Sequence, residues 1–192
     1  RAAILPAIKS DSIETVWDAA RWNTELTADF GPLSLDTALA WAQAMGKKLG
    51  VVVTDEDLAD FVRENARIAA EYLNESTQAQ VEAALAEEDP KSAVRQVFET
   101  LLAVAVVRFA ISRVTTLSNY GSYQAAVRGR ITTKTWVVNS TNPRDSHAAM
   151  NGETVGIRDR FSNGLRWPGD YAGGAEQTVN CQCSLRYNRD GE

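Results

Sequence analysis

The sequence Gly129-Arg130-Ile131-Thr132-Thr133-Lys134-Thr135-Trp136-Val137-Val138 decides the fold class, because the hydrophobic period changes within it. β-branched and aromatic residues in partial alternation are typical of a strand. Before this stretch, apolar residues recur at helical spacing, and after it Asn-Pro, Asn-Gly and Pro-Gly dipeptides mark tight turns. The sequence therefore predicts an α+β protein. A mostly helical region over residues 1–127 precedes a small, turn-rich antiparallel sheet over residues 128–192.

Turn and capping signals divide the helical region into several expected helices. The signals are a break at Gly31-Pro32, a cap at Ser34, a stop at Gly50, a start at Thr54 with Asp57, and a cap at Asp89-Pro90. A polar stretch over residues 75–88 is expected as a separate helix. The helix that begins at Asp89-Pro90 carries apolar residues at helical spacing, and we expect it to continue to about residue 126.

Composition limits the size and the environment of the core. The chain has 192 residues and 44% hydrophobic content, which is enough for one good core, or for one large and one small core. No apolar run approaches the roughly 20 residues that a bilayer-spanning helix needs. We therefore expect no membrane partner.

Charge is distributed unevenly around the net value of −5. Residues 1–90 hold 7 Lys/Arg and 17 Asp/Glu, a balance of −10, whereas residues 91–192 hold 13 and 8, a balance of +5. No acid lies between Glu99 and Asp145, but six bases do: Arg108, Arg113, Arg128, Arg130, Lys134 and Arg144. Such a basic segment is typical of a surface that binds DNA or an acidic protein. Alternatively, the six side chains lie on ordinary solvent-exposed faces. The charge is too modest for a dedicated DNA-binding domain.

The only histidine and both cysteines fall within four short blocks near the C-terminal end. The blocks are Asn142-Pro143-Arg144-Asp145-Ser146-His147, Asn151-Gly152-Glu153-Thr154-Val155, Trp167-Pro168-Gly169-Asp170 and Asn180-Cys181-Gln182-Cys183-Ser184-Leu185. On an extended strand, residues i and i+2 point to the same face, so Cys181 and Cys183 point the same way. A disulfide across one intervening residue would be strained. Two free thiols or two metal ligands are therefore expected.

Three interpretations of the histidine and the cysteines stay open at the level of sequence. Asp145, His147, Cys181 and Cys183 together meet the ligand count of a tetrahedral zinc site. Alternatively the thiols pack as small hydrophobes while His147 hydrogen-bonds a turn. A third interpretation is a cysteine nucleophile with His147 as its base. The sequence contains no Gly-rich phosphate loop and no paired-carboxylate hydrolase pattern.

The order of the four blocks resembles the phage Mu protein F-like (MuF) family of minor capsid and head-morphogenesis proteins. The resemblance covers roughly residues 108–187. It includes a helix ahead of the sheet region in which Thr116 stands where the family usually has Glu. This departure removes any role that would need a carboxylate at that position.

The resemblance implies a structural minor capsid protein of a tailed double-stranded DNA phage, required for head morphogenesis. It implies a location in the virion, at the portal vertex or in the head interior, and in the host cytoplasm during assembly. The expected partners are the portal protein, other capsid proteins and packaged DNA, with no cofactor unless zinc is bound. One alternative is a metal- or thiol-dependent capsid-maturation hydrolase. A second is a DNA-contacting protein of the capsid interior that uses the six bases.

Overall fold

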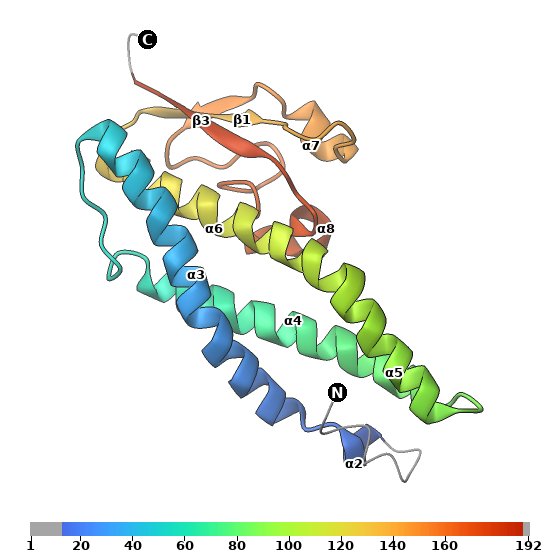
Figure 1. Cartoon of the computed structure of the whole chain (residues 1–192). Helices are drawn as coiled ribbons and strands as arrows, with labels where there is room; N and C mark the ends of the chain where they lie inside the picture. Colours follow the sequence, from blue (N-terminus) through green and yellow to red (C-terminus); the bar gives the residue numbers. More distant parts are fainter. Residues whose placement is uncertain (1–12, 190–192) are drawn as a thin grey trace. The chain divides into compact units, whose positions relative to one another are not determined.

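The computed structural model describes residues 13–189, whose helices and strands are drawn in Figure 1. The helices are α2 (Ile13–Val16), α3 (Ala19–Leu49), α4 (Ala59–Leu85), α5 (Pro90–Thr100), the π-helical turn η1 (Leu101–Ala105), α6 (Val106–Arg128), α7 (Asp145–Ala149), the 3-10 turn η2 (Tyr171–Gly173) and α8 (Gly174–Thr178). The strands are β1 (Thr133–Val137), β2 (Thr154–Gly156) and β3 (Ser184–Asn188). Helices dominate up to Arg128, and every strand of the described part follows Gly129, which confirms the α+β prediction.

The chain packs into two compact units, each built from two segments. Unit 1 comprises Arg1–Pro32 and Arg63–Val107, and unit 2 comprises Leu33–Val62 and Arg108–Glu192. The change from helices to strands and turns lies between Arg128 and Thr133, inside unit 2. Among residues 13–189, no helix combines the length and the apolar character that crossing a bilayer requires.

Two expected helix breaks are wrong. α3 runs through Gly31-Pro32 without interruption, so Ser34 lies inside this helix and does not cap a new one. An internal proline removes a single backbone donor, and the other hydrogen bonds of the helix remain. Beyond the proline, Ala38 and Ala42 are fully buried in unit 2, which stabilises the continuous helix. The polar stretch over residues 75–88 likewise forms no separate helix, because α4 extends through most of it to Leu85.

Other expected helix boundaries are confirmed. α3 ends at Leu49, directly before Gly50, whose φ is +71°. The Asp57 carboxylate accepts a hydrogen bond from the Thr54 N–H at 2.9 Å, ahead of α4. The Asp89 carboxylate accepts from the backbone N–H of Ser92 at 3.2 Å, and Pro90 is the first residue of α5. α5, η1 and α6 follow one another without a gap, so the long helix is present and extends to Arg128.

Unit 1 has its own hydrophobic core. The core combines residues of α2 and the residue that follows it, the end of α4, and α5: Ile13, Val16, Trp17, Val81, Ala84, Leu85, Val94 and Phe98. The indole N–H of Trp17 donates to the Asn74 side-chain oxygen at 2.8 Å, which satisfies its buried polar atom. Asn74 in turn donates to the carbonyl oxygen of Ala19 at 2.8 Å and so connects α4 to the start of α3.

The sheet of unit 2 is antiparallel, with the order β2-β1-β3. In the register of β1 with β3, Thr133 is opposite Asn188 and Val137 is opposite Ser184. β1 is central and its middle residues are buried, in keeping with its β-branched and aromatic composition. Figure 1 shows the sheet alongside α6, with α7 beyond one end of β1.

Two clusters of buried residues hold unit 2 together. The first joins α3, α4 and α6 with the Pro-Gly turn, where the rings of Phe61 and Tyr120 stack 3.6 Å apart and Trp167 packs edge-on. Within this cluster, a Cβ on Gly121 would lie only 2.1 Å from the carbonyl oxygen of Ala38. The close approach of α3 and α6 therefore requires glycine. The second cluster lies beside the sheet and consists of Trp136, Met150, Phe161, Leu165, Cys181 and Cys183.

Candidate functional site

The only histidine and both cysteines meet in the second cluster of unit 2. His147 Nδ1 lies 3.7 Å from Cys181 Sγ and 3.5 Å from Cys183 Sγ, and the three atoms all lie within 4.8 Å of one another. Each residue is buried, with 2% to 4% of its surface exposed. The Asn142–His147 and Asn180–Cys183 blocks therefore lie together, as the zinc and the nucleophile interpretations both require.

The backbone around the cysteines explains why both thiols face His147. Cys181 to Cys183 lead directly into β3, and both side chains contact the same ring nitrogen, as their i, i+2 spacing predicts. Both cysteines are free. Asn180 precedes them with φ of +55°, a left-handed conformation that asparagine tolerates better than most residues. The Asn-Cys start of this block thus forms the turn that brings the thiols to the histidine.

Gln177 fixes the orientation of the imidazole. Its side-chain oxygen lies 3.0 Å from His147 Nε2. An amide oxygen accepts hydrogen bonds only, so Nε2 carries the proton of the neutral ring. The lone pair of Nδ1 then faces the two sulfur atoms. Sequence reasoning missed Gln177, which stands on α8 between two of the four blocks and belongs to neither.

Arg144 holds the segment that carries Gln177. Its guanidinium donates to the carbonyl oxygen of Gln177 at 3.0 Å and to that of Val179 at 2.7 Å. These bonds connect the residue just before α7 to the end of α8 and the residue that follows it. Arg144 is therefore used within unit 2, where it positions the two chain segments that flank His147.

A polar stripe on α6 binds the backbone of the cysteine segment. The stripe consists of Ser112, Thr115, Thr116 and Asn119, which share one face at i, i+3, i+4 and i+7. Three of its bonds are Asn180 N–H to Ser112 Oγ at 2.7 Å, Thr115 Oγ1 to the Cys181 carbonyl at 2.7 Å, and Asn119 Nδ2 to the Cys183 carbonyl at 3.1 Å. Small polar residues at this spacing on a buried helix are the sequence signal by which the stripe could have been found.

The two thiols affect each other's protonation. A hydrogen bond from Cys183 lowers the pKa of the Cys181 thiol, and His147 acts in the same direction. The same bond and burial raise the pKa of Cys183, while the charge of Arg144 opposes that rise. Cys181 is therefore the member of the pair that becomes a thiolate first.

Asp145 does not join the group. It is the first residue of α7 and is exposed, and it is absent from the set of ligand atoms that lie together. Residues two positions apart on a helix point about 200° apart, so Asp145 and His147 face different directions. Of the four candidate ligands, the structure brings together His147, Cys181 and Cys183.

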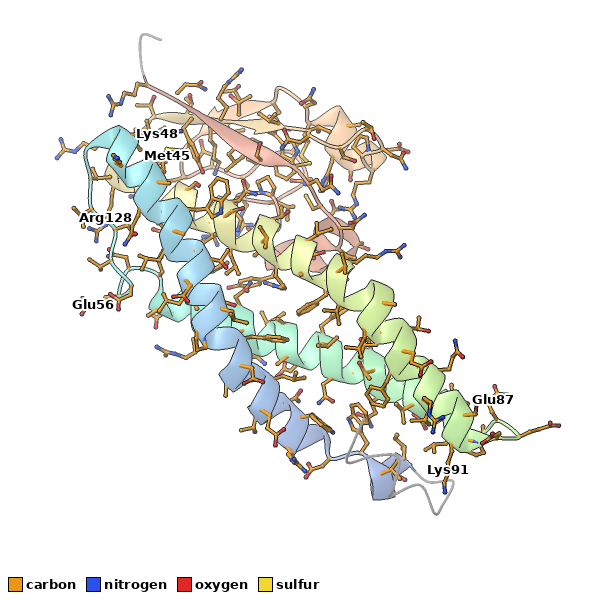
Figure 2. The ribbon with its side chains drawn as sticks, viewed as in Figure 1. Met45, Lys48, Glu56, Glu87, Lys91 and Arg128 are labelled. Carbon is orange, nitrogen blue, oxygen red and sulfur yellow. The ribbon has the colours of Figure 1, made fainter. Side chains whose placement is uncertain are left out.

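The six bases do not form one contact surface. Lys134 is fully buried, with its ammonium 2.9 Å from the carbonyl oxygen of Ile157, so it is removed from the candidate DNA contacts. Arg144 is bound to the carbonyls of the α8 segment. Arg128 donates to the carbonyl oxygen of Val52 at 3.0 Å and pairs with Asp57, close to the connection between α3 and α4 (Figure 2). Arg113 is half-buried, and Arg108 and Arg130 are exposed.

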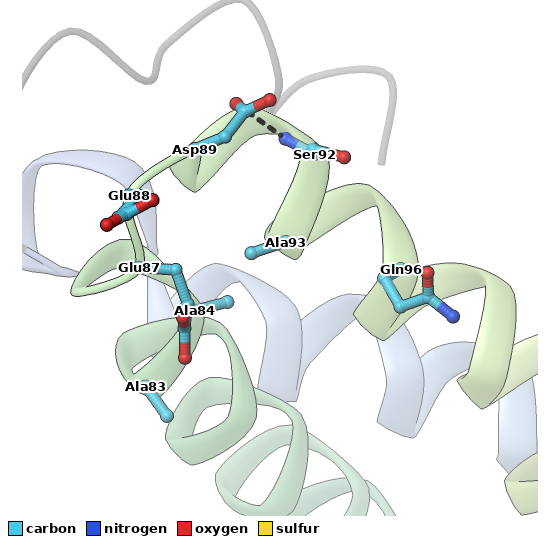
Figure 3. A pocket seen from close by; sticks show the side chains of 8 residues that line it. All are labelled: Ala83, Ala84, Glu87, Glu88, Asp89, Ser92, Ala93 and Gln96. Carbon is cyan, nitrogen blue, oxygen red and sulfur yellow. Dashed lines mark hydrogen bonds between the residues drawn. The ribbon is translucent and has the colours of Figure 1, made fainter.

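A hollow in unit 1 carries no comparable chemistry. It lies at the turn between α4 and α5 and is lined by small and acidic residues, among them Ala84, Glu87 and Asp89 (Figure 3). The Asp89 carboxylate is occupied as the cap of α5, as the dashed line to the Ser92 nitrogen shows. No histidine or cysteine lines this hollow, and we assign no site to it.

Comparison with family models, with curated proteins and with solved structures finds no match to this chain. The functional interpretation therefore depends on the residues and on the resemblance of the four blocks.

Proposed function

We propose that the chain is a structural minor capsid protein of a tailed double-stranded DNA phage and takes part in head morphogenesis. The proposal starts from the resemblance of residues 108–187 to the MuF family. It places the chain near the portal vertex and the packaged DNA, with the portal protein and other capsid proteins as partners.

One observation carries the structural role: distinctive residues of the four blocks are used in hydrogen bonds within the chain. Arg144 of the first block binds the carbonyls of Gln177 and Val179, just ahead of the last block. In the second block, the Asn151 side chain accepts from the Val138 N–H at 3.0 Å, and Gly152 N–H donates to the Trp136 carbonyl at 2.9 Å. These side chains are thus used for the fold itself, as a scaffold protein requires.

The third block is held in the same manner. The Asp170 carboxylate accepts from the backbone N–H groups of Arg166 and Ala172, both at 3.1 Å. The carbonyl oxygen of Gly169 lies 3.0 Å from the hydroxyl of Thr116 on α6. Each block therefore contributes a hydrogen-bonded turn to one compact module of unit 2.

Burial of the cysteines favours the structural role over the alternative hydrolase. A nucleophile must reach the substrate carbonyl, yet Cys181 and Cys183 are 2% and 4% exposed. Their backbone carbonyls are bound to α6 by Thr115 and Asn119, which fixes the segment in place. The DNA-contact alternative has less support, because Lys134, Arg128 and Arg144 are engaged within the protein.

The test is to locate the chain in assembled particles. Heads released by cells that produce the chain are purified on a density gradient, and mass spectrometry measures its copy number relative to the portal and major capsid proteins. A few copies per head, cross-linked to the portal protein, are expected. Complete recovery of the chain in the particle-free fraction would exclude the proposal.

A Cys181→Ser chain distinguishes the hydrolase alternative in the same experiment, because Cys181 is the thiol whose pKa is lowered. A maturation hydrolase that has lost its nucleophile would fold normally, and heads with unprocessed capsid proteins would accumulate. A structural protein gives the same processing pattern with either residue, although the variant is less stable. Accumulation of unprocessed heads with a well-folded variant would contradict the structural role.

A further inference from the structure

We infer that His147, Cys181 and Cys183 bind one Zn²⁺ ion through Nδ1 and the two thiolate sulfurs. This site depends only on residues of unit 2, and its test requires no phage particle. Two thiolates and an imidazole are a donor set that zinc prefers. Magnesium and calcium prefer oxygen ligands, so sulfur and nitrogen donors do not favour them.

The spacing of the three atoms fits a tetrahedral ion. Zinc–sulfur bonds near 2.3 Å and zinc–nitrogen bonds near 2.05 Å, at tetrahedral angles, place sulfur and nitrogen about 3.6 Å apart. The two observed separations, 3.7 Å for Cys181 and 3.5 Å for Cys183, lie on either side of that value. Both sulfur–nitrogen separations therefore match those of a tetrahedral zinc site, and the three atoms lie within 4.8 Å of one another.

The imidazole is already in the form that binds metal. Its Nε2–H donates to the Gln177 side-chain oxygen, which leaves the Nδ1 lone pair free and directed at the sulfurs. Histidine ligands of metals are typically oriented by such a bond from the other ring nitrogen. Gln177 is a positioning residue for this site, and Arg144 holds the backbone on which Gln177 stands.

A buried donor without an acceptor points to the same site. The indole Nε1–H of Trp136 is fully buried and has no hydrogen-bond partner among the described residues. The ring of Trp136 lies 5.1 Å from that of His147, and Trp136 and Cys183 belong to the same buried cluster. A thiolate bound to zinc keeps negative charge on sulfur and accepts hydrogen bonds. Metal binding therefore gives this N–H a strong acceptor.

The fourth coordination position belongs to a small external ligand such as water. Among the described residues, no other histidine, cysteine or acid places a ligand atom in the group. A hollow of about 490 Å³ within unit 2 is lined by Cys183 together with Ser118, Asn119 and Asn139. A bound ion connects α7 to the start of β3 and stabilises the folded module.

Metal analysis of the full chain tests the inference. The protein is purified under reducing conditions in the presence of Zn²⁺, dialysed, and analysed for bound metal. One zinc per chain is expected. Replacement by Co²⁺ should give the thiolate-to-cobalt charge-transfer band of two sulfur ligands. A chelator should lower the melting temperature of the wild-type protein.

Variants assign the metal to the three residues. Cys181→Ser, Cys183→Ser and His147→Gln should each abolish stoichiometric zinc, and Gln177→Leu should weaken zinc affinity about 10- to 100-fold by freeing the ring. Met150→Leu is the matched control, because Met150 is a buried member of the same cluster without a ligand role. It should keep one zinc per chain.

Two outcomes overturn the site even if a cysteine variant fails to fold. The first is a reduced wild-type chain that holds no stoichiometric zinc and gives no charge-transfer band with Co²⁺. The second is zinc retained at one equivalent in a folded Cys181→Ser or Cys183→Ser chain, which would place the ion elsewhere.

Discussion

The hydroxyl of Thr116 lies 3.0 Å from the carbonyl oxygen of Gly169, and this contact joins α6 to the Pro-Gly turn. Thr116 is 2% exposed, and it stands where the MuF resemblance has Glu. The Gly169 backbone lies directly against Thr116, since a Cβ added to Gly169 would lie 2.5 Å from Thr116 Oγ1. Thr116 therefore contributes a buried hydrogen bond between α6 and the Pro-Gly turn.

Thr116→Val should lower the free energy of unfolding by about 1–3 kcal/mol, because the Gly169 carbonyl loses its buried donor. Valine keeps the shape of threonine, so packing is nearly unchanged. Thr37→Val is the control, because the Thr37 hydroxyl bonds only to the Leu33 carbonyl of its own helix. Urea denaturation measures both variants, and equal effects would show that the contact to Gly169 contributes nothing.

Gly169→Ala should destabilise the chain more than Gly152→Ala, although both glycines have φ above +80°. A Cβ on Gly169 would lie 2.5 Å from Thr116 Oγ1 and 2.8 Å from Thr116 Cα, whereas nothing lies within 4 Å of one on Gly152. Both alanines carry the strain of a left-handed backbone, about 1–2 kcal/mol. Only Gly169→Ala adds overlap with a helix backbone, about 1–3 kcal/mol more. Equal melting temperatures of the Gly169→Ala and Gly152→Ala variants would contradict this prediction.

The helices and the central strand could be predicted because their signals are local. The Asp89-Pro90 cap and the β-branched β1 each depend on neighbouring residues, and both are present. The break at Gly31-Pro32 was wrong because burial of Ala38 and Ala42 beyond it outweighs one missing backbone bond. β2 was missed because three residues, Thr154–Gly156, are too short for an alternating pattern.

The candidate site was predictable only in part. The shared face of the two thiols followed from their i, i+2 spacing. The proximity of His147 could be expected because its block and the cysteine block both flank strands of one small sheet. The role of Gln177 could not be predicted, because its contact with His147 spans 30 residues and depends on where α8 lies. The burial of Lys134 was also missed. Its neighbours in the strand are threonines, which are found on both buried and exposed faces of a sheet, so the local sequence does not indicate which face is buried.

Arg144→Lys should lower the free energy of unfolding by about 1–2 kcal/mol, because an ammonium cannot donate to both the Gln177 and Val179 carbonyls in the fork geometry of a guanidinium. The net charge is unchanged. Arg130→Lys, at an exposed position, should change stability by less than about 0.5 kcal/mol. If Arg144 served only as a charge for a partner, the two variants would melt at the same temperature.

The contribution of Lys134 to the free energy of unfolding should increase as the pH rises from about 8 to about 10.4. Burial lowers the pKa of Lys134 to about 8, although the carboxylate of Asp159 opposes this. Below pH 8 the folded chain holds a buried ammonium, with the rings of Tyr123 and Phe161 at 5.0 Å and 5.4 Å. Between the two pKa values the unfolded chain binds more protons than the folded chain, so raising the pH favours folding.

Lys134→Met isolates this effect, because methionine has a similar shape and does not titrate. The difference in unfolding free energy, wild type minus variant, should increase by about 1–3 kcal/mol from pH 7 to pH 10.4, because other titrating groups cancel. Chemical denaturation of both proteins at each pH measures it. A difference that stays constant across this range would show that the Lys134 ammonium keeps an ordinary pKa despite its burial.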